Sequence, residues 1–190
     1  MKINSFTNYK LHDQIVEKVH GWSPADQLLA LFNTAISTNL IKNADILEVG
    51  TWCGRSSISL AFAAKNISCK VHAIDLFPGK NDWYINDDGN ASFQTKVNKK
   101  QISGYTDQRV WPDAFEYLID GYKFHKNNDL EKIFKNNLKT FKIDQYVLPF
   151  KGTLKEFLKI NKNKYRMIFL DGDHSFKGVS EEIKLVKKSK

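Results

Sequence analysis

Four short apolar runs alternate with segments of helical periodicity along the chain. The runs lie at 44–50, 70–77, 145–152 and 165–173, and each has the length and continuous apolar character of a buried strand. Helical spacing of apolar residues precedes the first run and follows the first, third and fourth runs. Alternating strands and helices predict an α/β fold with a doubly wound parallel sheet and helices on both faces.

Local signals mark where several helices begin. We expect Ser23 to cap the first helix, with Pro24 at its first position. Asp129 is placed to cap a helix that starts at 130. Thr153 and Glu156 have the spacing of a capping box, which predicts a short helix directly after the third strand.

The segment 78–142 is too long for an ordinary crossover and is rich in turn-forming residues at its start. We interpret it as an inserted lid, although ordinary packing helices would give the same helical signals at 111–121 and 129–141. We expect one domain over 1–190, which divides into an N-terminal helical segment at 1–43, a ligand-binding core at 44–77 and 143–190, and the insert at 78–142.

Composition narrows the class of protein. The chain has 190 residues, 42% of them hydrophobic, and a net charge of +8, which fits one globular domain. Nearly all of the 29 basic residues are lysines, whereas base readout favours the bidentate fork of arginine. We therefore favour a solvated lysine-rich surface over a nucleic-acid interface, and an acidic partner stays open.

The cysteine content and the absence of a long apolar run bear on where in the cell the protein is located. The only cysteines, Cys53 and Cys69, are too few for a disulfide framework or a four-ligand zinc site. No apolar run reaches 18 residues, and the first residues lack the pattern of a signal peptide. We expect a soluble, cytoplasmic protein that does not enter a membrane.

The strongest chemical signal is that all four predicted strands end in polar or glycine residues. Ligands of doubly wound parallel sheets bind at these carboxyl ends. Gly50 and Gly54 would let a ligand lie against the turn after the first strand, where a helix start offers free N–H groups. Trp52 stands where a dinucleotide-binding loop needs its middle glycine, which weakens the prediction of a pyrophosphate ligand.

Two acids belong to this predicted edge. Glu48 ends an apolar strand, and a buried carboxylate there needs a partner, for which a ligand ammonium is suitable. Asp75 ends the second strand, where a carboxylate can accept both hydroxyls of a ribose. A structural capping aspartate would look the same in the sequence.

Three stretches resemble a known family: ILEVGTWCGRSSISLA, VHAIDLF and MIFLDGDHSFKGVSEEI. They are similar to the class I S-adenosylmethionine-dependent methyltransferases, whose fold is Rossmann-like. More narrowly, they resemble a bacterial group of sugar and small-molecule O-methyltransferases akin to macrocin O-methyltransferase. The similarity covers about residues 20–76 and 130–188. That family has seven strands, so the resemblance implies that the last three are missing and that the chain is a fragment or is completed by another chain.

The resemblance implies a set of cofactor-binding residues at the strand ends. The loop that would hold the methionine part of S-adenosyl-L-methionine corresponds to Glu48, Gly50, Thr51, Gly54 and Ser56.

It assigns the other parts of the cofactor as well. Asp75 would bind the ribose hydroxyls, with Leu76 beside the adenine. Gly152 and Thr153 would lie close to the adenine ring, and Asp171 would face the sulfonium and the substrate.

A methyl acceptor hydroxyl must lose its proton, and His174 is the candidate general base, with Asp171 or Asp173 orienting it. In metal-using relatives the acid equivalent to Asp171 also binds magnesium, and Asp173 would add a second oxygen ligand. The alternative is a plain strand-to-helix turn in which an acid and Ser175 act as caps.

We therefore expect a methyltransferase that moves a methyl group to a hydroxyl of a small molecule or sugar. Two alternatives stay open: an NAD(P)-dependent Rossmann oxidoreductase and a non-catalytic nucleoside-binding relative. Trp83, Tyr84 and Trp111 of the insert are expected to form an aromatic cap over the acceptor pocket. The sequence leaves homo-oligomerisation open.

Overall fold

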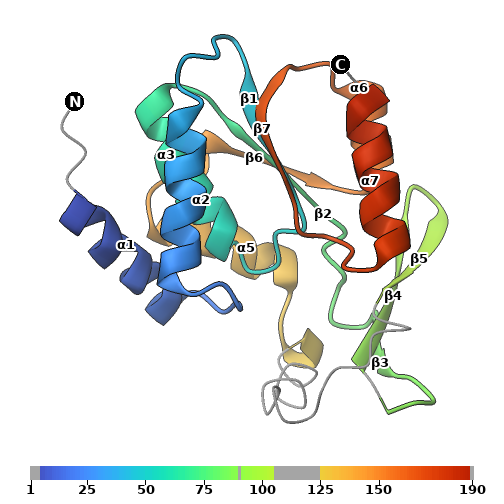
Figure 1. Ribbon diagram of the computed structural model, residues 1–190. Helices are drawn as coiled ribbons and strands as arrows, with labels where there is room; N and C mark the ends of the chain where they lie inside the picture. The colour runs from blue at the N-terminus through green and yellow to red at the C-terminus, as the bar shows by residue number, and fades with distance from the viewer. Residues whose placement is uncertain (1–4, 90, 105–124, 189–190) are drawn as a thin grey trace. The chain divides into compact units, whose positions relative to one another are not determined.

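The computed structural model describes residues 5–89, 91–104 and 125–188, with side chains from Tyr9 onward (Figure 1). The chain forms two compact units. Unit 1 comprises Met1–Asp75 and Phe134–Lys190, and unit 2 comprises Leu76–Ile133. The division predicted from the sequence, with an insert at 78–142, stays a prediction.

Unit 1 is built on a four-stranded parallel sheet. Its spatial order is β6-β2-β1-β7, so the first two strands along the chain lie at the centre. The strands are β1 (Asp45–Val49), β2 (Val71–Asp75), β6 (Val147–Lys151) and β7 (Tyr165–Leu170). The predicted α/β fold with a parallel sheet is confirmed, and all four strands lie within the predicted runs.

The helices α1 (Ser5–Lys18), α2 (Ala25–Ser37) and α3 (Arg55–Ile67) pack against one another. Figure 1 shows α2 and α3 together on one side of unit 1, and α6 (Leu154–Ile160) with α7 (Phe176–Lys188) on the other. The helix α5 (Leu130–Thr140) crosses from unit 2 into unit 1 at Phe134. The helix α1 lies within the helical segment predicted at 1–43, but its bounds were not predicted from the sequence.

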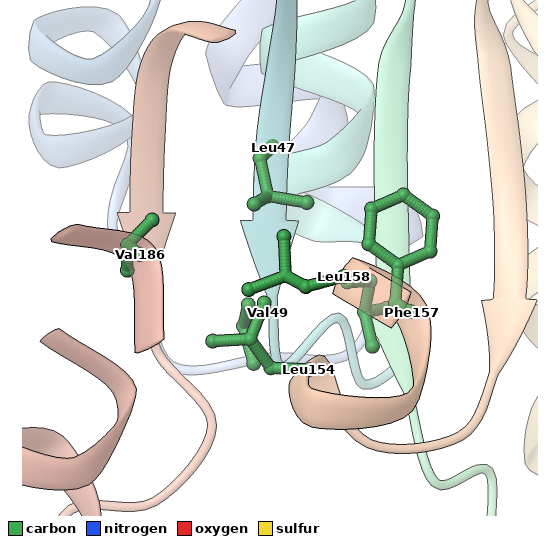
Figure 2. Close-up of a cluster of buried hydrophobic side chains, with 7 residues drawn as sticks. Leu47, Val49, Leu154, Phe157, Leu158 and Val186 are labelled. Carbon is green, nitrogen blue, oxygen red and sulfur yellow. The ribbon is translucent and has the colours of Figure 1, made fainter. Parts of the chain in front are cut away.

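A buried apolar cluster joins the sheet to α6 and α7 (Figure 2). Alternate residues of a strand point to opposite faces, so Leu47 and Val49 of β1 enter this cluster while Glu48 points toward α3. Burial of this side removes apolar surface from water and fixes the register of β1. The cluster consists of Leu47, Val49, Ile74, Leu154, Phe157, Leu158 and Val186.

The predicted cap of the first helix is wrong. Pro24, in an extended conformation with ψ 169°, occupies the N-cap position of α2 and makes no side-chain capping bond. Ser23 therefore lies one residue outside the helix. Its carbonyl oxygen instead accepts a hydrogen bond from Arg55 Nη1 at 3.0 Å, a tertiary contact that no local pattern reveals.

The two other predicted caps are confirmed. Asp129 Oδ1 accepts from the backbone N–H of Lys132 at 3.0 Å. Thr153 Oγ1 accepts from Glu156 N at 3.2 Å, and Glu156 Oε2 accepts from Thr153 N at 3.1 Å, which completes the capping box of α6. The start of α6 is thus fixed by two residues three positions apart, a spacing that can be recognised in the sequence.

Replacing Thr153 by alanine is expected to lower the free energy of unfolding by about 1 kcal/mol, because the first turn of α6 loses its side-chain acceptor. Thr153→Ser keeps the hydroxyl and is the matched control. Urea denaturation of both variants measures the difference. Equal destabilisation by serine and alanine would show that the methyl group, not the hydroxyl, stabilises the turn.

Unit 2 contains a three-stranded antiparallel sheet that was not predicted from the sequence. Its strands are β3 (Trp83–Ile85), β4 (Ala91–Val97) and β5 (Lys100–Gly104). The turn between β4 and β5 is Asn98-Lys99, both with positive φ (48° and 66°). Two-residue hairpins usually carry glycine at such positions, so the strongest hairpin signal is absent here.

One of the three aromatic residues predicted to cap the acceptor pocket, Trp83, differs from its predicted role. The ring of Trp83 stacks on His125 with centroids 3.8 Å apart and is only 3% exposed. Trp83 is thus part of the core of unit 2, and the prediction that it offers an aromatic face to an acceptor is wrong. Tyr84 is 37% exposed, and Trp111 with the helix predicted at 111–121 lies outside the described residues.

Candidate functional site

The ends of the four parallel strands meet at one edge of unit 1. Main-chain hydrogen bonds link them: Gly50 N donates to Ile74 O at 2.8 Å, and Asp171 N donates to Val49 O at 2.8 Å. On the other side of β2, Gly152 N donates to Asp75 O at 2.9 Å. The structure therefore brings together the predicted residues of β1, β2, β6 and β7.

The turn after β1 depends on two glycines. Gly50 has φ +83°, and a Cβ there would lie 2.2 Å from the backbone oxygen of Asp171. Gly54 has φ +94°, precedes α3 in a left-handed conformation, and would place a Cβ 2.9 Å from the ring of Phe134. Both positions need glycine, because a side chain would be strained at these φ values and would collide with a neighbouring residue. At Gly50 the absence of a side chain allows the turn to approach the end of β7 closely.

Asp75 ties this turn to β2. Its Oδ2 accepts hydrogen bonds from the backbone N–H groups of Thr51 at 2.8 Å and Trp52 at 3.0 Å. The hydroxyl of Thr51 donates to the same oxygen at 3.3 Å. The carboxylate thus has a structural role in holding the loop, which sequence reasoning had kept as the alternative to ribose binding. Its role toward a ribose stays a prediction.

Glu48 is fully buried beneath the same turn. Its Oε2 accepts a hydrogen bond from Ser57 Oγ of α3 at 2.5 Å, and Oε1 has no hydrogen-bond partner among the described residues. Burial raises the pKa of Glu48 to about 7, hydrogen bonds from Ser56 and Ser57 oppose the rise, and the charges of Asp171 and Asp75 add to it.

The turn after β7 carries the other predicted catalytic residues. Burial raises the pKa of Asp171, and the neighbouring His174 charge opposes the rise. Asp173 Oδ1 accepts from Ser175 N at 2.8 Å, and Ser175 Oγ accepts from Gly178 N at 3.0 Å in the first turn of α7. Asp173 and Ser175 thus act as turn and cap residues. His174 is exposed next to Asp171.

The remaining predicted residues have simpler positions. Ser56 is buried and hydrogen-bonds Glu48 from the first turn of α3. Gly152 and Thr153 form the turn between β6 and α6, where Thr153 serves the capping box. Leu76 begins unit 2, and its predicted place beside the adenine stays a prediction.

Residues 47–189 match a family model described as a methyltransferase domain. The chain belongs to this methyltransferase family. The matched range contains the glycine turn and every strand-end acid described above. The family supports the broader part of the resemblance, to class I S-adenosylmethionine-dependent methyltransferases, and it does not favour an oxidoreductase.

No curated protein matches the methyltransferase chain. A similar solved structure is the crystal structure of cofactor-bound Rv0187 from MTB, with 14% sequence identity and a TM-score of 0.48. The match covers 95% of this chain and 60% of that one, so the methyltransferase chain spans 60% of the length of that structure. Within the described ranges, no helix is long and apolar enough to cross a membrane.

The acids at the strand ends do not form a magnesium site among the residues that the structure describes. Within residues 5–89, 91–104 and 125–188, no group of three or more His, Cys, Asp or Glu is placed to hold a metal. Asp173, predicted as a ligand beside Asp171, is instead bonded within its own turn.

Two residues near the strand-end site were not predicted from the sequence. Ser57 holds Glu48, and its signal was a polar residue on the buried face of α3. Glu182 of α7 lies against the turn after β7, since a Cβ on Gly172 would be 3.3 Å from Glu182 Oε1. Burial raises the pKa of Glu182 to about 7, and the charge of Asp173 adds to this. The carboxylates at this edge therefore outnumber those predicted.

Proposed function

We propose that the chain binds S-adenosyl-L-methionine at the glycine turn and transfers its methyl group to a hydroxyl of a small molecule or sugar. The observation that carries the proposal is the buried carboxylate of Glu48, whose Oε1 has no hydrogen-bond partner among the described residues. A buried carboxylate oxygen without a partner is costly, and a ligand ammonium would compensate it.

The charge of the site supports a cationic ligand. Glu48 feels the charges of both Asp75 and Asp171, so three carboxylates share one electrostatic environment around the turn. A sulfonium and an ammonium are attracted by this field, whereas the pyrophosphate of NAD would be repelled. The absence of a glycine at Trp52 supports the same choice.

Each residue then has a role in the proposal. Glu48 binds the ammonium, the turn from Gly50 to Gly54 surrounds the methionine part, and Asp75 accepts from the ribose hydroxyls. The bound cofactor supplies an electrophilic methyl group. His174 removes the proton of the acceptor hydroxyl, and Asp171, whose charge interacts with His174, stabilises the imidazolium that forms. Correct orientation of the acceptor hydroxyl toward the methyl group lowers the rest of the activation barrier.

The narrower substrate class rests on the resemblance to the macrocin O-methyltransferase group. Transfer of a radiolabelled methyl group from S-adenosylmethionine to a panel of glycosides and small hydroxyl compounds tests it. Product formation supports the enzyme. Cofactor binding without product from any acceptor would instead support the alternative of a non-catalytic nucleoside-binding relative.

Replacing Asp75 by asparagine is expected to weaken S-adenosylhomocysteine binding about tenfold, because the charge that attracts the ribose hydroxyls is lost while the amide oxygen still accepts from the turn. Titration calorimetry measures the affinity. Asp26→Asn, a charge change on the exposed face of α2, is the matched control. Unchanged affinity in Asp75→Asn, or no binding by the unaltered chain, would contradict the proposed function.

A further inference from the structure

Two indole rings lie together at the turn after β1. Trp22, from the connection between α1 and α2, has its ring centroid 4.7 Å from that of Trp52, with 54° between the planes. Trp22 is 56% exposed, although the hydrophobic effect favours burial of so large an apolar ring. An exposed tryptophan beside a ligand-binding turn provides apolar surface for a ligand.

Trp52 is held in an uncommon conformation. Its φ of 49° lies in the left-handed region, which is costly for a bulky side chain and persists only where the surroundings enforce it. The enforcing contact is the hydrogen bond from Trp52 N to Asp75 Oδ2. The position of the Trp52 indole is therefore set by the same loop that forms the proposed cofactor site.

The backbone segment that carries Trp22 is held by Arg55. The guanidinium donates to the carbonyl oxygens of Val19 at 2.9 Å from Nε and 2.6 Å from Nη2, and to Ser23 O at 3.0 Å from Nη1. These carbonyls flank Trp22 on both sides. Gly21 lies directly on the arginine, since a Cβ there would be 3.2 Å from Nε.

Arg55 is also the first residue of α3, directly after the glycine turn. One side chain thus fixes the segment around Trp22 relative to the turn that carries Trp52. A surface fixed before binding loses little entropy when a ligand stacks on it. The backbone segments that carry the two indole rings are therefore fixed relative to each other before a ligand binds.

We propose that Trp22 and Trp52 bind a six-membered ring of the methyl acceptor by stacking on its apolar face. This inference rests on the proposed function, because it places that ring beside the cofactor turn. Pyranose and aryl rings share this stacking chemistry, and the experiment separates them. The two tryptophans select the methyl acceptor, whereas Glu48 and Asp75 bind the cofactor.

Saturation-transfer NMR titrations of the full chain test the proposal with three probes: methyl β-D-glucopyranoside, catechol and the acyclic polyol sorbitol. We expect at least one ring compound to bind more tightly than sorbitol, and the preferred ring identifies the acceptor type. Trp22→Ala should weaken that binding by about fivefold or more. Trp22→Phe should retain most of it, because an aromatic face is still present.

Leu40→Ala is the matched control, since Leu40 is 84% exposed and precedes the amino end of β1, whereas the glycine turn follows the carboxyl end of that strand. S-adenosylhomocysteine affinity, measured in parallel, should change less than about twofold in every variant. Equal binding of rings and sorbitol, or ring binding unchanged in Trp22→Ala, overturns the inference. A loss of S-adenosylhomocysteine affinity in Trp22→Ala overturns it too, since the ring would then contact the cofactor. Ring binding that persists without any S-adenosylhomocysteine binding contradicts the proposed function and leaves the ring site supported.

Discussion

Replacing Gly50 by alanine is expected to lower the free energy of unfolding by about 3 kcal/mol and to abolish S-adenosylhomocysteine binding. The new Cβ would meet the backbone of Asp171 at 2.2 Å, at a φ of +83° that disfavours any side chain. Backbone cannot move aside as a flexible side chain can, so β1 and β7 would have to separate at their ends. Urea denaturation and titration calorimetry measure the two effects.

A control variant at Gly89 separates the cost of a positive φ from the cost of steric overlap. Gly89 has a similar φ of +78°, but a Cβ there would have nothing within 4 Å among the described residues. Gly89→Ala should therefore cost only the conformational penalty of about 1 kcal/mol. If both variants lose the same stability, the close approach of the β1 turn to Asp171 is not what makes Gly50 necessary.

Replacing Glu48 by glutamine is expected to remove a pH dependence of stability. The pKa of Glu48 is raised from 4.5 to about 7, so between these values the folded chain keeps a proton that the unfolded chain has lost. Stability therefore falls as the pH rises across this window, at about 1.4 kcal/mol per pH unit and about 3 kcal/mol in all. Above pH 7, Glu48→Gln should be the more stable protein by about this amount.

The same substitution should weaken S-adenosylhomocysteine binding at pH 8 by about tenfold or more, since a neutral amide replaces a charged partner of the ligand ammonium. In the unaltered chain this affinity should rise with pH up to about 7, because binding needs the ionised carboxylate. Urea denaturation and calorimetry at pH 5 and pH 8 measure both effects. Glu17→Gln, on the exposed face of α1, is the control.

Two results would count against this account of Glu48. A stability difference between the two proteins that is the same at pH 5 and pH 8 would mean that the carboxyl does not titrate in this window. Equal affinity of both proteins at pH 8 would mean that the ammonium binds elsewhere in the site.

Much of the core could be predicted from local pattern. The four runs of unit 1 became strands because each is a short apolar segment bounded by turn residues, and the capping box of Thr153 depends only on neighbours in sequence. Unit 2 was harder. Its β4–β5 turn uses Asn98 and Lys99 in place of glycine, and its strand alternation is interrupted, so no local signal identified the sheet.

The site, too, has a part that the sequence predicts and a part that it does not. The residue types at the strand ends, Glu48, Gly50, Asp75 and Asp171, could be recognised from the sequence, because parallel strands place their carboxyl ends at one edge. Their partners could not. Ser57 is one of several polar residues at the start of α3, and only the packing of α3 on β1 shows that its hydroxyl donates to Glu48 Oε2 at 2.5 Å.

The sequence by itself determined the parallel sheet, the helix starts at 130 and 154, and the set of strand-end residues, because these follow from periodicity and short-range spacing. The tertiary structure decided which carboxylates share an environment, that Asp75 holds the glycine turn, and that Arg55 joins the segment around Trp22 to that turn. These contacts join residues more than 20 positions apart. Their geometry depends on how whole elements pack, which no local pattern encodes.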